Sequence, residues 1–289
     1  MSHATKVVVI DLDKDQVVGE IIDTPGVHGF AVGTGLGRGF SSNGRENKVS
    51  VVDLKTLKTL SKVETGENPD AILFEPEQRQ IYAFNGRGNS ATVIDAESSK
   101  VVATIPLHGK PEFAAVDPKA ARIYCNLEDK NAVAVLDAKE HKVVGTWPIT
   151  PGEEASGMAI DLNHHRLYLG CHNKLMVMMD STNGNVLASV PIGEGVDANA
   201  FDPGTRLAFA SCGDGTVTIA HEDSPDKLTV LQNLKTERGA RTMALDPRTH
   251  HIYLSTARFE PASASSEAGR QRPKMIPGTF KVLVYGMEK

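Results

Sequence analysis

Six polar residues recur along the chain at similar intervals, each just before a run of small, strand-forming residues: His28, Asp70, Glu112, Ser156, Asp197 and Arg241. If these side chains converge, they can bind a polar ligand. Oxygen-rich rings bind calcium, and a histidine among carboxylates suits zinc. A cation of either kind would take its ligands from the imidazole and carboxylates of this set, His28, Asp70, Glu112 and Asp197. The fold must therefore gather residues that lie far apart in sequence.

A second group of polar residues follows the next strand-like run of each repeat. Arg45 and Arg87 occupy near-equivalent places and could form a basic patch for an anionic ligand, with Asn85 beside them. His172, in Gly170-Cys171-His172-Asn173-Lys174, is either a general base or metal ligand acting with Glu154, or a hydrogen-bonded loop histidine. Signatures of serine hydrolases, phosphate-binding loops and zincins are absent from the sequence.

An internal repeat sets the spacing of these residues. Five strand-like runs end in Asp11, Asp53, Asp95, Asp137 and Asp180, which are separated by 42, 42, 42 and 43 residues. An aromatic series has the same period: Phe40, Tyr82, Tyr124, Tyr168, Phe209 and Tyr253. Two interleaved markers with one period indicate a repeat architecture.

Each repeat contains four short strand-like runs, which we term a to d. Strand a is a small-residue run, strand b carries the aromatic residue, strand c ends in Asp, and strand d follows a turn. Alternating apolar residues in c and d, with Pro and Gly at the junctions, favour strands over a helix. Four strands in about 40 residues are typical of a β-propeller blade, so the sequence predicts an all-β propeller of antiparallel blades.

Two motifs carry a resemblance to a known family. Tyr82-Ala83-Phe84-Asn85 and the looser Phe40-Ser41-Ser42-Asn43, each followed by a strand of Val-x-Val-Ile-Asp type, resemble YVTN-family β-propeller repeats over essentially the whole chain. The resemblance implies a WD40-like, lactonase-like propeller. Such propellers serve as surface-layer modules, binding proteins, lactonase-like enzymes or cofactor-bearing subunits, so the motif indicates fold more than function.

The resemblance also implies seven blades, which the strands do not supply. The chain opens on a c–d pair without its a and b strands and ends on a strand c without its d. We expect one domain over 1–289, with repeats at 1–26 (partial), 27–69, 70–111, 112–155, 156–196, 197–240 and 241–289. Either the ring has seven blades with an incomplete first blade, whose reading frame begins upstream, or it closes with six. Dimerisation would also cover exposed blade edges.

A propeller brings the start of each strand a, with the d-to-a and b-to-c loops, to one face around the channel mouth. We expect the polar ring there, either as a solvated channel lining or as a site. The insertion at 258–279 should emerge on this face, as a disordered decoration or as a lid. The turns at 163–165, 249–251 and 222–227 belong to the opposite face, where we expect solvated side chains.

Composition narrows the function. The chain has 289 residues, 40% of them hydrophobic, and a net charge of -5. It lacks a long apolar run and a basic face, which argues against a membrane span and nucleic-acid binding. Its start lacks a signal peptide, although relatives are usually secreted or periplasmic. The sequence predicts a scaffold that binds a small molecule or protein at the mouth. The alternative is a metal-assisted lactonase-like hydrolase, with calcium or zinc at the mouth and His172 and Glu154 as catalytic groups.

Overall fold

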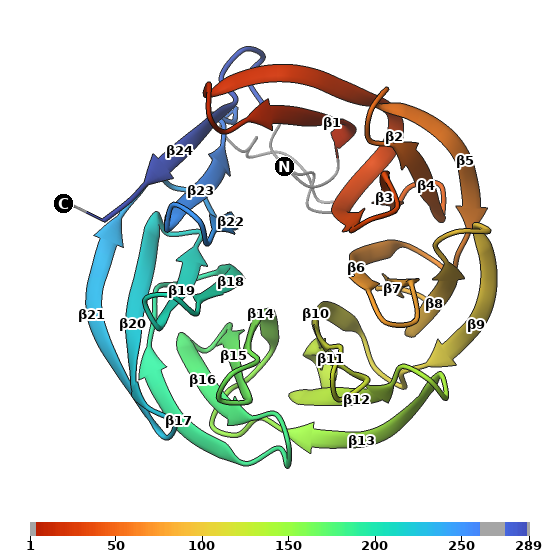
Figure 1. Ribbon diagram of the computed structural model, residues 1–289. Coiled ribbons are helices and arrows are strands. Elements are labelled where there is room, and N and C mark those ends of the chain that lie inside the picture. Colours follow the sequence, from red (N-terminus) through yellow and green to blue (C-terminus); the bar gives the residue numbers. More distant parts are fainter. Residues whose placement is uncertain (1–3, 261–274, 288–289) are drawn as a thin grey trace, which may run out of the picture.

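The computed structural model describes residues 4–260 and 275–287, which form six antiparallel sheets arranged radially around a central channel (Figure 1). The predicted all-β propeller is therefore confirmed. Much of the insertion predicted at 258–279 lies outside the described residues. No helix in the described part of the chain is long and apolar enough to cross a membrane.

We number the sheets I to VI in chain order. Sheet I contains β1 (Ala4–Asp11), β2 (Gln16–Gly33), β3 (Arg38–Asn43), β4 (Lys48–Asp53) and β5 (Lys58–Glu64). Sheet II contains β6 (Pro69–Glu75), β7 (Gln80–Asn85), β8 (Ser90–Asp95) and β9 (Lys100–Pro106). Sheet III contains β10 (Pro111–Asp117), β11 (Arg122–Leu127), β12 (Ala132–Asp137) and β13 (Lys142–Pro148), with a 3-10 turn at Glu128–Lys130.

The second half of the ring repeats this pattern. Sheet IV contains β14 (Ala155–Asp161), β15 (Arg166–Cys171), β16 (Leu175–Asp180) and β17 (Val186–Pro191). Sheet V contains β18 (Val196–Asp202), β19 (Leu207–Cys212), β20 (Thr216–Ser224) and β21 (Lys227–Lys235). Sheet VI has three strands, β22 (Thr242–Asp246), β23 (His251–Thr256) and β24 (Lys281–Tyr285).

Four of the recurring aspartates end β4, β8, β12 and β16, at the turn to the outermost strand of sheets I to IV, and Asp11 ends β1. The Asp53 carboxylate accepts hydrogen bonds from the backbone N–H groups of Lys55 and Thr56, at 3.0 and 2.7 Å. Asp137 accepts from the N–H groups of Lys139 and Glu140, both at 2.9 Å. A short carboxylate that binds its own following backbone favours a tight turn, so the repeated Asp has a local structural role.

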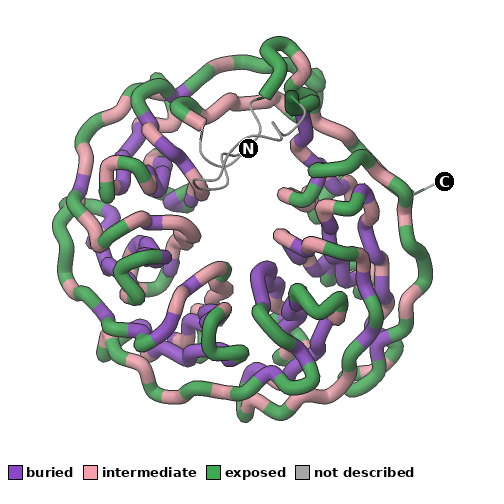
Figure 2. The backbone as a smooth tube through the Cα atoms, turned by 180° about the vertical axis from the view of Figure 1, so that it is seen from behind, coloured by how far each residue is buried: buried purple, intermediate pink, exposed green. Residues whose placement is uncertain are grey.

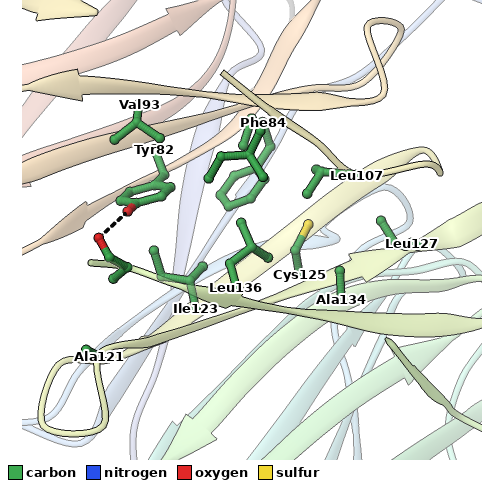
Figure 3. Close-up of a cluster of buried hydrophobic side chains, with 13 residues drawn as sticks. Tyr82, Phe84, Val93, Leu107, Ala121, Ile123, Cys125, Leu127, Ala134 and Leu136 are labelled. Carbon is green, nitrogen blue, oxygen red and sulfur yellow. Dashed lines mark hydrogen bonds between the residues drawn. The ribbon is translucent and has the colours of Figure 1, made fainter. Parts of the chain in front are cut away.

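The hydrophobic core lies between the sheets, in five clusters that fill the interfaces from I–II to V–VI. In the cluster between sheets II and III, the Tyr82 hydroxyl donates a 3.2 Å hydrogen bond to the Ala138 carbonyl (Figure 3). All three cysteines, Cys125, Cys171 and Cys212, are buried and free. Burial is densest in the two middle strands of the four-stranded sheets, and the outermost strands consist mostly of half-buried and exposed residues (Figure 2).

The main prediction of seven blades is wrong, and the six-bladed alternative is confirmed. The expected c–d pair exists as β1 and the first part of β2, but β2 continues without a break and pairs with β3. The pair is thus continuous with the first blade and does not form a separate sheet in the described part of the chain. It instead adds a fifth strand to sheet I.

The junction between sheets VI and I differs from the other five. Described residues of β1, β2 and sheet VI line an open groove of about 740 Å³, with Ile10, Val17 and Leu245 among its apolar walls. An ion pair crosses this junction, with Arg248 Nη2 3.1 Å from Asp13 Oδ1. The ring therefore closes here without a packed core, and whether a second copy covers the edge stays a prediction.

Candidate functional site

The predicted polar ring comes together at the channel mouth. One pocket of about 560 Å³ at the ends of the inner strands is lined by His28, Asp70, Glu112, Ser156, Asp197 and Arg241. The first five of these residues lie at or beside a register irregularity in their sheets. In each sheet the irregularity falls where the innermost strand pairs with the next strand outward. Irregular pairing of this kind turns side chains away from the regular alternation, which explains how residues in buried strands reach the pocket.

Ion pairs balance the charges of this pocket. His28 Nδ1 lies 2.5 Å from Asp70 Oδ1, and Arg241 Nε lies 3.6 Å from Asp197 Oδ2. Lys110 Nζ lies 2.5 Å from Glu112 Oε1 and also contacts Glu128. Each of the three acids thus has a basic neighbour. Repulsion among converging carboxylates is relieved by the chain's own side chains.

The pocket-lining carboxyl group of Glu112 has a pKa above its ordinary value. Burial raises the pKa of Glu112 to about 7, and the carboxylates of Asp70 and Glu128 act in the same direction, although Lys110 opposes them. Near neutral pH the Glu112 carboxyl therefore exists in both protonation states. Perturbed groups of this kind are common at binding sites, and here the group can either donate or accept a hydrogen bond.

Apolar side chains complete the pocket. Phe30, Ile72, Leu73, Phe113 and Met243 lie among the polar residues of the lining. Phe113 is 41% exposed although it lies on an inner strand of a sheet whose core is otherwise buried. A pocket with apolar walls and a few polar groups is the usual form of a small-molecule site.

The structure places the second group of predicted ligand-binding residues, Arg45, Asn85 and Arg87, in different surroundings. Arg87 lines the pocket, and its Nη1 lies 3.9 Å from Glu67 Oε1. Arg45 is exposed in the turn between β3 and β4, outside the pocket lining. Asn85 is fully buried, and its side-chain nitrogen donates to Ser90 and Thr92, both at 3.0 Å. Of these three, only Arg87 reaches the pocket, and the basic patch stays a prediction.

His172 and Glu154 lie on the rim beside sheets III and IV, outside the pocket lining. His172 Nδ1 lies 3.7 Å from Glu154 Oε2 and 4.0 Å from Glu128 Oε1. The His172 side chain is 39% exposed. Both residues are thus close enough for an electrostatic interaction, but they do not face the axial pocket, and a catalytic role for them stays a prediction.

One side-chain group among the described residues could hold a metal: Asp161, His164 and Glu222, whose ligand atoms lie within 4.8 Å of one another. It belongs to the face opposite the mouth and shares no residue with the predicted metal set. The expectation of solvated side chains at 222–227 is wrong for Glu222, which is 1% exposed. It points into the junction of sheets IV and V, because β20 extends to Ser224 instead of ending before the turn.

Comparisons with known proteins identify the fold of the chain but not its family. No protein-family model matches the chain, and no curated sequence matches it. The YVTN resemblance therefore stays a resemblance.

Solved structures do match. A structure titled hydrazine synthase of Kuenenia stuttgartiensis has a TM-score of 0.71 at 20% identity, covering 80% of this chain and 74% of that one. The WD40 repeats of RRP9 give 0.77 at 10% identity, covering 87% and 81%. A chain of a mitotic checkpoint complex gives 0.76 at 15% identity, covering 86% and 78%. At these identities the likeness concerns architecture, and the chain is a β-propeller with a WD40-like fold.

Proposed function

We propose that this protein is a binding scaffold whose channel-mouth pocket takes a small molecule with both an apolar part and a polar or charged group. The observation that carries the proposal is the single axial pocket to which all six sheets contribute residues. A rigid ring fixes the positions of these residues, so the ligand meets a preorganised surface. Propellers are commonly binding scaffolds, and this role requires no chemistry beyond recognition.

The lining favours such a ligand for two reasons. The charged groups occur as opposed pairs, His28 with Asp70 and Arg241 with Asp197, so ligand groups of either sign find a partner. Phe113 and Met243 offer apolar surface beside them. A concave pocket of about 560 Å³ also encloses a small molecule better than the flat surface of a protein.

The hydrolase alternative has weaker support. It needs a cation at the mouth, yet the Glu112 and Asp197 carboxylates are engaged by Lys110 and Arg241. It also needs a base aimed at the bound substrate, and His172 lies outside the pocket lining. Metal-dependent turnover of a lactone, lost in His172→Ala, would favour the hydrolase over the scaffold.

The test is a ligand-observed NMR screen with a mixture of small polar and amphiphilic metabolites. We expect at least one compound to bind the wild-type protein and to lose binding in Arg241→Glu. Arg248→Glu on the opposite face, where the side chain is 67% exposed, is the matched control and should bind normally. A full screen without hits, or equal binding by both variants, would contradict an axial small-molecule site.

A further inference from the structure

Glu222 occupies a position that small or apolar residues fill in the other sheets. In sheets II to V, the residue that follows the partner of the second strand's first residue donates its backbone N–H to a carbonyl just before that strand. These hydrogen bonds run from Ala96 to Arg79, Ala138 to Ala121, Ser181 to His165 and Glu222 to Arg206, at 2.9 to 3.0 Å. The equivalent residue in sheet I is Leu54. Ala96 and Ala138 are 0% exposed, and Ser181 is 3% exposed. A carboxylate therefore stands where the repeat otherwise places a small buried side chain.

His164 departs from the repeat at the same junction. It lies two residues before β15, where the other sheets have Leu36, Gln78, Ala120, Thr205 and Thr249. His164 belongs to sheet IV and Glu222 to sheet V, so the two unusual residues face each other across one boundary. A paired departure from a repeat indicates a joint role for the two side chains.

The three side chains converge on a common point. His164 Nδ1 lies 2.8 Å from Asp161 Oδ2 and 3.2 Å from Glu222 Oε1. The side chains of Asp161 and Glu222 are each 1% exposed. Despite these short separations, His164 Nδ1 and both Glu222 carboxylate oxygens lack a partner in hydrogen-bonding geometry. Their polar atoms are thus close but not aimed at one another.

A neighbouring histidine on the same face shows ordinary behaviour. His250 Nδ1 makes a 2.7 Å hydrogen bond with Asp202 Oδ2, and Asp202 is equally buried. The contrast with His164 concerns geometry alone, because both pairs join a half-exposed imidazole to a buried carboxylate. His250 is therefore a matched control for His164.

Tyr168 gives a second, independent observation. Its hydroxyl is buried without a hydrogen-bond partner, whereas the equivalent hydroxyls of Tyr82 and Tyr124 donate to the carbonyls of Ala138 and Ser181. The Glu222 carboxylate is close enough to act on this hydroxyl electrostatically. The hydroxyl thus lies beside the anomalous carboxylate as a neutral donor, suited to orient a metal ligand.

We propose that Asp161, His164 and Glu222 form a divalent-metal site of the zinc type that joins sheets IV and V. Zinc is bound by histidine nitrogen and carboxylate oxygen at about 2.0 to 2.2 Å, so tetrahedral ligand atoms lie about 3.3 Å apart. The observed 2.8 and 3.2 Å separations approach this value. A dication would neutralise two buried carboxylates that are otherwise costly.

The experiment titrates Zn²⁺ into EDTA-treated, dialysed protein without an affinity tag, using calorimetry and thermal unfolding. Glu222→Ala and His164→Thr introduce residues that the repeat already tolerates at these positions, so both variants should fold. We expect one high-affinity site in wild type and a higher Tm with zinc. Because loss of a residue that merely supports a ligand weakens metal affinity by about 10- to 100-fold, both variants should lose at least that much. His250→Thr should match wild type.

Cobalt gives a second readout that does not depend on the variants. Co²⁺ at this site should produce visible absorption bands of a low-coordinate complex in wild type, displaced by Zn²⁺. Absence of zinc binding by wild type, or equal binding by Glu222→Ala, would overturn the proposal.

Discussion

The two faces of the ring use the same residue types in opposite ways. At the mouth, Asp70, Glu112 and Asp197 each have a basic neighbour from the same face. At the junction of sheets IV and V, two carboxylates that are 1% exposed share His164 as their ion-pair partner, although Asp161 also accepts the backbone N–H groups of Asn163 and His164. The mouth therefore balances its own charge, whereas the junction needs a positive partner from outside.

This difference shows why convergence of acids does not by itself identify a metal site. The acids of the mouth lie on separate inner strands, and each has a Lys, Arg or His neighbour. The junction is closed by packing on both sides. Burial without compensation, more than the number of carboxylates, marks a place where a cation would stabilise the fold.

We expect the largest effect on stability from a substitution that places a buried carboxylate at the junction of sheets II and III. Ala138→Glu places a carboxylate at a fully buried position, where the residue equivalent to His164 is Gln78. The charge would lack a partner, so we expect a loss of about 3 to 5 kcal/mol in the free energy of unfolding. Urea denaturation measures it. If Ala138→Glu has the same free energy of unfolding as wild type, an unpaired carboxylate at this position does not destabilise the fold. The contrast between the two faces would then be wrong.

Removing the native carboxylate should have the opposite sign. In metal-free protein, Glu222→Ala replaces an uncompensated buried carboxylate with the residue found at the equivalent place in sheets II and III. We expect the free energy of unfolding to rise by about 1 to 3 kcal/mol. The same denaturation series in EDTA measures the change. A destabilised variant would mean that Glu222 is already well paired without a metal.

The mouth makes a prediction about pH. The pKa of Glu112 is about 7 in the folded protein, above its ordinary value of 4.5. The unfolded chain therefore releases the proton first, and this residue's contribution to stability, present below about pH 4.5, is lost as pH rises through 7. Wild type should lose about 3 kcal/mol across this window relative to Glu112→Gln. Unfolding measured from pH 4.5 to 8 checks this, and parallel profiles would show that Glu112 has an ordinary pKa.

The smallest expected effect on stability lies at the rim of the mouth. Arg241 is 50% exposed and its contact with Asp197 is 3.6 Å long, so Asp197→Asn should cost less than about 1 kcal/mol. Binding of a ligand found by the NMR screen should nevertheless weaken clearly. A large loss of stability with unchanged binding would make this pair structural instead of functional.

The architecture was predictable because each repeat contains residues whose local interactions form turns and strands. The Asp that caps each turn and the buried aromatic of each second strand recur at one period, so four-stranded blades follow from sequence. The number of blades did not follow, since it depends on whether β2 ends after Ile22 or continues to Gly33. Sequence patterning cannot distinguish these outcomes, because both halves of β2 have the residue types of a strand.

The gathering of the polar ring was also predictable, because equivalent positions in a propeller meet at one axis. The pairing of those residues was not. Lys110 lies two residues from Glu112, and only the structure shows that it reaches both Glu112 and Glu128. The Asp161–His164–Glu222 group was missed although a signal existed. Aligning Glu222 with Ala96, Ala138 and Ser181 would have revealed a charged residue in a column of buried positions.

The central claim, that the mouth balances its own charge and the junction of sheets IV and V does not, is tested most directly by an anomalous difference map. Crystals soaked in a zinc salt and measured on both sides of the zinc absorption edge would locate bound metal without any substitution. The account predicts a peak within bonding distance of His164 Nδ1, Asp161 and Glu222, and none among His28, Asp70, Glu112 and Asp197. A peak at the mouth with none at the junction would contradict it.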